Sequence, residues 1–134
     1  MRLNLQSIQQ INLFENVTGA KVKDCINDEE LIFIIEEGNI KRALGKDNAN
    51  IKKLESLLKK NIKLIAYSRD VIKFVTNLIY PIKPDNIDLK DDVIYITIND
   101  AKLKGRVYGR GRERLKKLEL IIKKYFNIKE IRIE

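Results

Sequence analysis

The sequence predicts an α+β protein made of two similar units, and two observations carry this prediction. The segment GKDNANIKKLESLLKK, which begins at Gly45, recurs in closely similar form as GRGRERLKKLELIIKK from Gly109. The same order of helical and strand patterns surrounds both copies, and internal repetition at such a period is typical of a repeated structural unit. The chain has 134 residues, of which 44% are hydrophobic, so it has enough apolar side chains to form a core.

The first unit is predicted to follow the order helix, strand, strand, helix, loop, helix, strand. Apolar residues at helical spacing predict an amphipathic helix over residues 3–17, which Gly19 is expected to end. The apolar face of this helix is expected to consist of Leu5, Ile8, Ile11 and Val17. The elements expected after it are strands over 20–27 and 31–36, helices over 37–44 and 49–60, and a strand over 62–68.

The second unit is predicted to repeat this order. It begins with a helix over 68–80, for which Ser68 is the expected N-cap and beyond which Pro81 prevents continuation. The elements expected after it are strands over 86–90 and 92–99, helices over 101–108 and 113–126, and a strand over 128–134. We therefore predict two domains, at 1–67 and 68–134, each a three-stranded sheet with helices on one face.

The excess of positive over negative charge lies in two segments, 41–63 and 101–124, which contain the two repeats. The net charge is +8. Residues 41–63 carry eight Lys or Arg against two Asp or Glu, and residues 101–124 carry ten against two, whereas carboxylates outnumber cations in the rest of the chain. This distribution favours a polyanionic partner. The alternative is a basic surface that only keeps the protein soluble.

Composition argues against an enzyme. The chain has no histidine and one cysteine, Cys25, which excludes an internal disulfide, a zinc site and histidine-based catalysis. The carboxylates of Asp24, Asp28, Glu29 and Glu30 lie around a predicted hairpin turn, where acidic residues are ordinary. Neither glycine loop has the spacing of a nucleotide-binding P-loop. We expect no catalytic residue, metal, cofactor or small-molecule substrate.

The location of the protein is expected to be cytoplasmic. No apolar run approaches the roughly 18 residues that a membrane span needs. The first 14 residues, MRLNLQSIQQINLF, are too polar for a signal peptide.

Each repeated segment places a glycine loop before a basic helix, at 45–48 and at 109–112. A helix N-terminus attracts phosphate because its first N–H groups are unpaired and carry partial positive charge. A glycine lets another backbone approach, and nearby cations neutralise further phosphates. The alternative for the lysines is a solvated helix face.

This arrangement, helix–Gly-x-x-Gly–helix with a three-stranded sheet, resembles the KH domain in its prokaryotic (type II) form. More narrowly, LFENVTGAKVKDC (13–25), EGNIKRALGKDNANIKKL (37–54) and KGRVYGRGRERLKKLELIIKKYF (104–126) are similar to the archaeal NusA-like transcription factor family, a tandem pair of KH domains. The resemblance implies binding of single-stranded RNA, about four nucleotides per loop. It also implies RNA polymerase as a partner and a role in transcription termination and antitermination.

The residues that the resemblance implies for RNA binding lie in and just after the two loops. They are Gly45, Lys46, Asn48, Lys52, Lys53, Gly109, Arg110, Gly111, Arg112, Arg114, Lys116 and Lys117. Where the family has a last glycine, this chain has Asn48 and Arg112, and Asn tolerates the left-handed backbone region better than most residues. Asp47 also puts a carboxylate in the first loop. We therefore expect the second loop to be the stronger RNA contact.

The apolar residues near the loops allow two interpretations. Five of them can either line a groove for bases or belong to the core, namely Ile40, Leu44, Ile51, Val107 and Leu115. Tyr108 can stack on a base or pack on its own sheet.

Two other functions remain open from the sequence. One is an adaptor that contacts polymerase or the ribosome through a KH fold with weakened RNA binding, which the altered loops favour. The other is a ribosome-associated KH protein. The affinity for RNA at physiological salt separates the adaptor from the RNA-binding factor.

Overall fold

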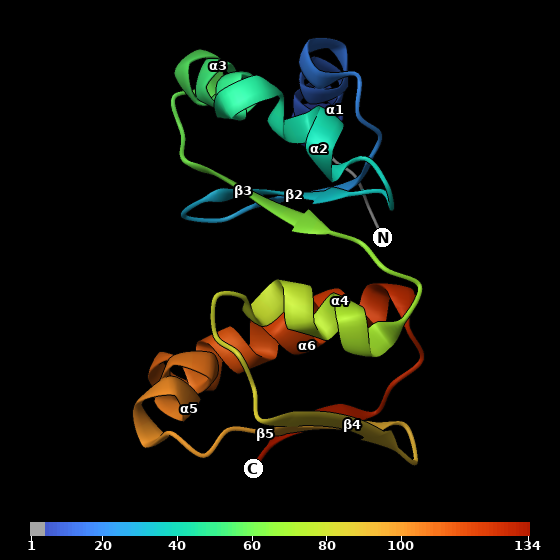
Figure 1. Ribbon diagram of the computed structural model, residues 1–134, viewed down its shortest axis with the longest axis vertical. Helices are drawn as coiled ribbons and strands as arrows, with labels where there is room; N and C mark the ends of the chain where they lie inside the picture. Colours follow the sequence, from blue (N-terminus) through green and yellow to red (C-terminus); the bar gives the residue numbers. More distant parts are fainter. Residues whose placement is uncertain (1–4) are drawn as a thin grey trace. The chain divides into compact units, whose positions relative to one another are not determined.

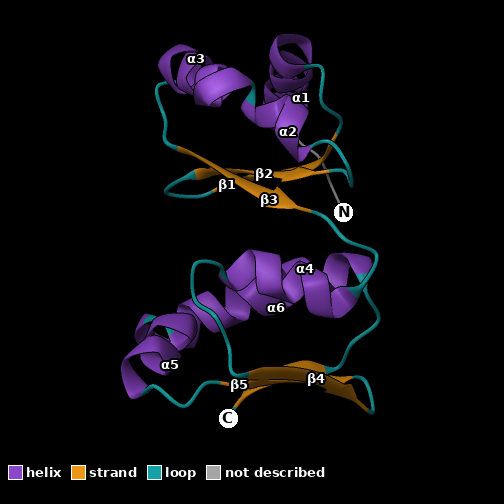
Figure 2. Ribbon diagram, viewed as in Figure 1, coloured by secondary structure: helices purple, strands orange, loops and turns teal. Residues whose placement is uncertain are grey.

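The computed structural model describes residues 5–134, which form two compact units divided between Ser68 and Arg69. Each unit lays its helices on one face of a three-stranded sheet (Figure 1 and Figure 2). Across residues 5–134, no helix is long and apolar enough to cross a membrane.

The first unit has the predicted order of elements. These are α1 (Leu5–Thr18), β1 (Val22–Asn27), β2 (Leu31–Ile35), α2 (Ile40–Leu44), the short 3-10 turn η1 (Lys46–Asn48), α3 (Ala49–Leu58) and β3 (Ile62–Ala66). The sheet order is β1-β2-β3, with β1 antiparallel and β3 parallel to β2. The second pairing is parallel because the chain crosses over through α2 and α3 before it returns to the sheet.

The core of the first unit lies between this sheet and its helices. The fully buried residues include Leu54 of α3 and alternate residues of β2, namely Leu31, Phe33 and Ile35. Phe14 of α1 packs on Phe33 with ring centroids 4.3 Å apart. This packing fixes the helices that carry the first glycine loop.

The buried face of α1 agrees with the predicted one at Ile11 and Val17, which pack against the core, and differs from it elsewhere. Leu5 is 71% exposed and Ile8 is 41% exposed, whereas Ser7, Phe14 and Thr18 are buried. The helix is turned so that Phe14 faces the sheet. The burial of Thr18 is tolerated because its hydroxyl donates to the carbonyl of Phe14 and accepts from a backbone N–H. Residues 3 and 4 of the predicted helix lie outside the described residues.

The predicted helix over 37–44 is shorter than expected, because α2 begins at Ile40. Gly38 has φ +79, in the left-handed region, so residues 37–39 form a turn. The side-chain oxygen of Asn39 accepts from the backbone N–H of Lys21, which ties this turn to the start of β1.

The second unit repeats the order of the first. Its elements are α4 (Val71–Ile79), β4 (Asn86–Lys90), β5 (Val93–Thr97), α5 (Ala101–Tyr108), the 3-10 turn η2 (Arg110–Arg112), α6 (Glu113–Tyr125) and β6 (Glu130–Ile133). The sheet order is β4-β5-β6, again with one antiparallel and one parallel pairing. The predicted α+β fold with two three-stranded sheets is confirmed.

The helix α4 begins later than predicted. Its N-cap is Asp70, whose carboxylate accepts from the N–H of Ile72 at 3.0 Å, so the assignment of Ser68 as the cap was wrong. Phe74 of α4 is fully buried and packs on the rings of Tyr125 and Phe126, with centroids 5.9 and 5.8 Å away.

Candidate nucleic-acid interface

The two glycine loops, Gly45–Asn48 (the first loop) and Gly109–Arg112 (the second loop), have the same backbone. Gly45 has φ 73 and ψ 177, and Gly109 has φ 70 and ψ 177. The third and fourth residues of both loops adopt the left-handed conformation, at φ between 53 and 63; they are Asp47, Asn48, Gly111 and Arg112. The repetition seen in the sequence therefore extends to the dihedral angles of the loops.

The first glycine of each loop is required by close approach as well as by its positive φ. A Cβ on Gly109 would lie 2.6 Å from the Cβ of Arg114 and 3.0 Å from its backbone nitrogen. A Cβ on Gly45 would lie 2.7 Å from the Cγ of Asn50. In the second unit the helix after the loop thus packs directly against the glycine that ends the helix before it, whereas in the first unit only the end of the Asn50 side chain lies there.

One hydrogen bond closes each loop from helix to helix. The Nδ2 of Asn50 donates to the carbonyl of Arg42 at 3.0 Å, and the Nη1 of Arg114 donates to the carbonyl of Arg106 at 3.3 Å. Sequence reasoning missed this role. The only available signal was that both residues stand five positions after the loop glycine and carry side-chain donors. The guanidinium of Arg114 has further donors for a ligand.

The helices after the loops begin without a side-chain cap. Asn48 and Arg112 occupy the N-cap positions of α3 and α6, and in the described part of the chain neither side chain accepts from the first turn. A helix N-terminus attracts anions through its partial positive charge, although the first N–H of each helix already donates within the loop, from Ala49 to the carbonyl of Lys46 and from Glu113 to that of Arg110. Each loop therefore places the positive end of a helix next to its cations.

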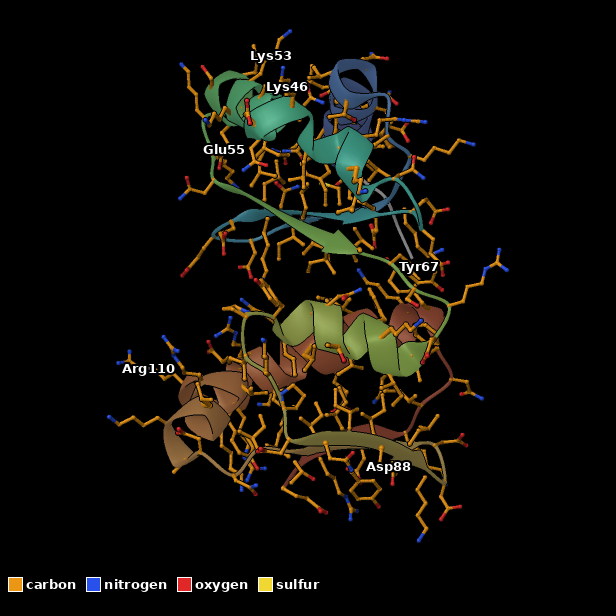
Figure 3. All side chains as sticks on the ribbon, in the orientation of Figure 1. Lys46, Lys53, Glu55, Tyr67, Asp88 and Arg110 are labelled. Atoms are coloured by element: carbon orange, nitrogen blue, oxygen red, sulfur yellow. The ribbon has the colours of Figure 1, made fainter. Side chains whose placement is uncertain are left out.

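Five of the predicted site residues come together in the first unit: Gly45, Lys46, Asn48, Lys52 and Lys53. The three lysines are exposed. Figure 3 shows Lys46 and Lys53 on the helical layer of this unit. The carboxylate of Asp47 is also exposed on the loop and reduces its positive field.

The other seven predicted residues come together in the second unit: Gly109, Arg110, Gly111, Arg112, Arg114, Lys116 and Lys117. The five cations among them are exposed. Figure 3 shows Arg110 beside α5, where it extends away from the ribbon. Where the first loop has Asp47, the second has Gly111, so this loop contains no carboxylate.

Tyr108 packs on its own sheet. Its hydroxyl donates to the carbonyl of Ile133 at 3.3 Å, and the guanidinium of Arg112 lies over its ring, 5.4 Å from the centroid. This cation–π contact offsets part of the cost of holding Arg112 in the left-handed region.

The apolar residues near the loops belong mostly to the two cores. Val107 and Leu115 are buried, and Ile40 and Ile51 pack against the core of the first unit. Leu44 is partly buried.

The described residues outside the two loops form neither a metal site nor a reactive thiol. Among residues 5–134 no three His, Cys, Asp or Glu side chains are grouped so as to hold a metal ion. Burial, with a smaller contribution from the neighbouring Asp24 carboxylate, raises the pKa of the Cys25 thiol to about 11. The thiol therefore stays protonated and unreactive at neutral pH.

Comparison with known proteins identifies relatives along the whole chain. Residues 9–78 match the KH domain family. The chain is 33% identical to the probable transcription termination protein NusA of Methanocaldococcus jannaschii, over 99% of this chain and 75% of that protein. It is 27% identical to the protein of the same description from Halococcus morrhuae, over 99% of both. The crystal structure of APE1850 superposes with a TM-score of 0.73 at 29% identity, over 98% of this chain and 100% of that chain.

Proposed function

The chain belongs to the NusA-like family of KH-domain proteins, and from this premise we propose that it binds single-stranded RNA and acts in transcription termination or antitermination. Members of this family are binding proteins rather than enzymes. The observation that carries the proposal is the matched backbone of the two loops, each followed by an uncapped helix and exposed cations.

The loops suit an RNA backbone for three physical reasons. The opening glycine has no side chain, so a strand can approach the turn. The positive end of the following helix, which has no side-chain cap, attracts phosphate. The exposed lysines and arginines neutralise neighbouring phosphates and release their counterions.

We propose that the chain consists of two KH domains, at 1–67 and 68–134, and that each loop holds about four nucleotides. In the first domain, Lys46, Lys52 and Lys53 contact phosphates. In the second, the contacts come from Arg110, Arg112, Arg114, Lys116 and Lys117. RNA polymerase is the proposed protein partner, which requires a cytoplasmic location.

The second loop is proposed to bind more strongly than the first. The residues Arg110 and Lys46 occupy the same position in the two loops, so their charge reversals are matched. We expect Arg110→Glu to weaken binding of a single-stranded RNA on the order of tenfold and Lys46→Glu about threefold. Fluorescence anisotropy measures both, with Lys73→Glu on α4 as a control for net charge.

Three results would count against parts of this proposal. Equal losses for the two loop variants would contradict the ranking of the loops. If Lys73→Glu, Arg110→Glu and Lys46→Glu all lowered the affinity for RNA by the same factor, only the net charge of the protein would matter. No RNA binding by the unchanged protein would reject the function and leave the protein adaptor, which a polymerase pull-down would then test.

A further inference from the structure

The helix α6 carries an exposed leucine on the side that faces away from its core. The buried residues of this helix are Leu115, Leu118 and Ile122, which follow the helical repeat. Leu120 stands two positions after Leu118, so it lies about 200° further around the helix. Its side chain is 64% exposed. The core of the second unit therefore gains little from an apolar side chain at this position.

Lysines surround this leucine along the helix. The neighbours of a residue on a helix surface stand three and four positions away on either side. For Leu120 these neighbours are Lys116, Lys117, Lys123 and Lys124, and all four are exposed. Each lysine also contributes the methylene groups of its stem. The α6 surface, defined as these five residues, thus has an apolar centre inside a positively charged rim.

Neither helix stability nor charge pairing within the chain explains the leucine. Lysine, glutamine and glutamate favour a helix about as strongly as leucine and are better hydrated on a surface. The Nζ of Lys123 lies 2.9 Å from a carboxylate oxygen of Glu119, whose other oxygen accepts from the backbone N–H of Ile131. An exposed ion pair of this kind contributes little to stability, so Lys123 can change to an external carboxylate.

The first unit repeats the lysines of this surface but not its apolar centre. Ser56 stands where the second unit has Leu120, with lysines at the same four spacings. The helix α3 ends at Leu58, and the Nζ of Lys60 beyond it donates to the carbonyl of Asp28 at 3.3 Å. The combination of a leucine with four lysines on one continuous helix is therefore a property of the second unit and not of the repeat.

We propose that the α6 surface docks an acidic helical segment of another protein, with an apolar side chain of that segment on Leu120 and its carboxylates facing the lysines. Charge complementarity selects an acidic partner. The leucine distinguishes a protein from an RNA strand, because phosphates are bound by cations and bases stack on planar groups. An amphipathic helix presents an apolar stripe with carboxylates beside it, which matches this surface. This docking does not depend on the proposed binding of RNA.

The test uses a labelled synthetic peptide of about 18 residues, long enough to form a helix, with leucines along one face and glutamates beside them. The control peptide has the same composition, with its leucines dispersed around the helix. Fluorescence anisotropy at low and at high salt measures binding to the full chain in the absence of RNA. We expect a dissociation constant on the order of 100 μM or tighter for the amphipathic peptide, and about fivefold weaker binding of the dispersed one.

Leu120→Gln removes the apolar centre and keeps a residue that favours a helix. We expect its affinity for the amphipathic peptide to fall about tenfold at both salt concentrations, because salt does not screen an apolar contact. Leu57→Gln is the matched control: it removes a leucine that is 54% exposed on α3 and that has lysines at only two of the four neighbouring spacings. This control is expected to bind the peptide as the unchanged protein does.

A second variant, Lys123→Gln with Lys124→Gln, tests the charged rim. The other two lysines of the α6 surface stay unchanged because they also belong to the proposed RNA site. We expect the affinity for the amphipathic peptide to fall about fivefold at low salt and much less at high salt, since salt screens exposed charges. Lys73→Gln with Lys83→Gln, which removes two exposed cations elsewhere in the same unit, is expected to have a smaller effect.

Several outcomes would overturn the proposal. They are no binding of the amphipathic peptide by the unchanged protein, equal binding of the two peptides, and equal affinities of Leu120→Gln and Leu57→Gln. A single-stranded RNA of about 12 nucleotides, enough for more than one loop, separates this surface from the RNA site, because Leu120→Gln should bind it as tightly as the unchanged protein. If Leu120→Gln lost affinity for RNA and peptide equally, the surface would belong to the RNA site and the docking proposal would fail, while the proposed function would stand.

Discussion

At the scale of single residues, the third loop position distinguishes the two loops. Asp47 and Gly111 have nearly the same backbone angles, at φ 53 and 61. Glycine adopts this conformation without strain, whereas Asp47 adopts it at a cost and adds a negative charge. At this position the first loop is therefore both more strained and less positive than the second.

Replacing this residue is expected to strengthen the first loop. Asp47→Gly should raise RNA affinity about threefold because it removes a carboxylate near phosphate. The free energy of unfolding should change by less than about 1 kcal/mol, since relief of strain offsets the greater freedom of glycine in the unfolded chain. Anisotropy and urea denaturation measure the two quantities.

Asp47→Asn is the matched control, because it removes the charge and keeps a side chain that tolerates the left-handed region. An equal gain for both variants would assign the effect to charge. No gain in either variant would contradict a phosphate contact at the first loop.

The backbone conformation of a single residue could be predicted from the sequence only where the residue type strongly favours one region. The left-handed Asn48 follows from the known tolerance of asparagine. The left-handed Arg112 does not, because arginine has no such preference and its contact with the ring of Tyr108 forms only once the loop has its shape. The hydrogen bond of Asn50 across the first loop also depends on how the two helices cross, which sequence spacing does not specify.

At the scale of elements, the position of α5 depends on its N-cap. The carboxylate of Asp100 accepts from the N–H groups of Lys102 and Leu103 at 2.9 and 3.2 Å. Asp100→Ala should lower the free energy of unfolding by about 1 kcal/mol, and Asp100→Asn should cost much less because asparagine caps equally well. Urea denaturation of both variants measures this, and equal losses would contradict capping by the side-chain oxygen.

Element bounds were predicted best where turn signals lie on both sides. The strand β4 and the helix α5 have the predicted bounds, 86–90 and 101–108. The predicted start of α2 was wrong because Gly38 and Asn39 hold the chain in a turn, whereas its predicted end at residue 44 was right. The predicted face of α1 was right for Ile11 and Val17, which pack against the core, and wrong for Leu5 and Ile8, because the pairing of Phe14 with the sheet turns them outward.

At the scale of the whole molecule, the chain carries two loops of the same backbone geometry, which we propose to be two RNA-binding sites. Two linked sites on one RNA gain affinity because binding at the second becomes intramolecular. The excess positive charge lies in residues 41–63 and 101–124, which contain the two loops, and this agrees with binding of one RNA at both loops. The repeat could be predicted from the sequence because the loop and the basic helix recur with the same spacing.

The most direct measurement is the anisotropy of a labelled single-stranded RNA of about 12 nucleotides, titrated with the unchanged protein at two salt concentrations and with duplex DNA as competitor. The account predicts micromolar or tighter binding that weakens steeply as salt rises and that duplex DNA does not displace. Absence of binding at low salt, or equal displacement by duplex DNA, would contradict the claim that the two loops recognise single-stranded RNA.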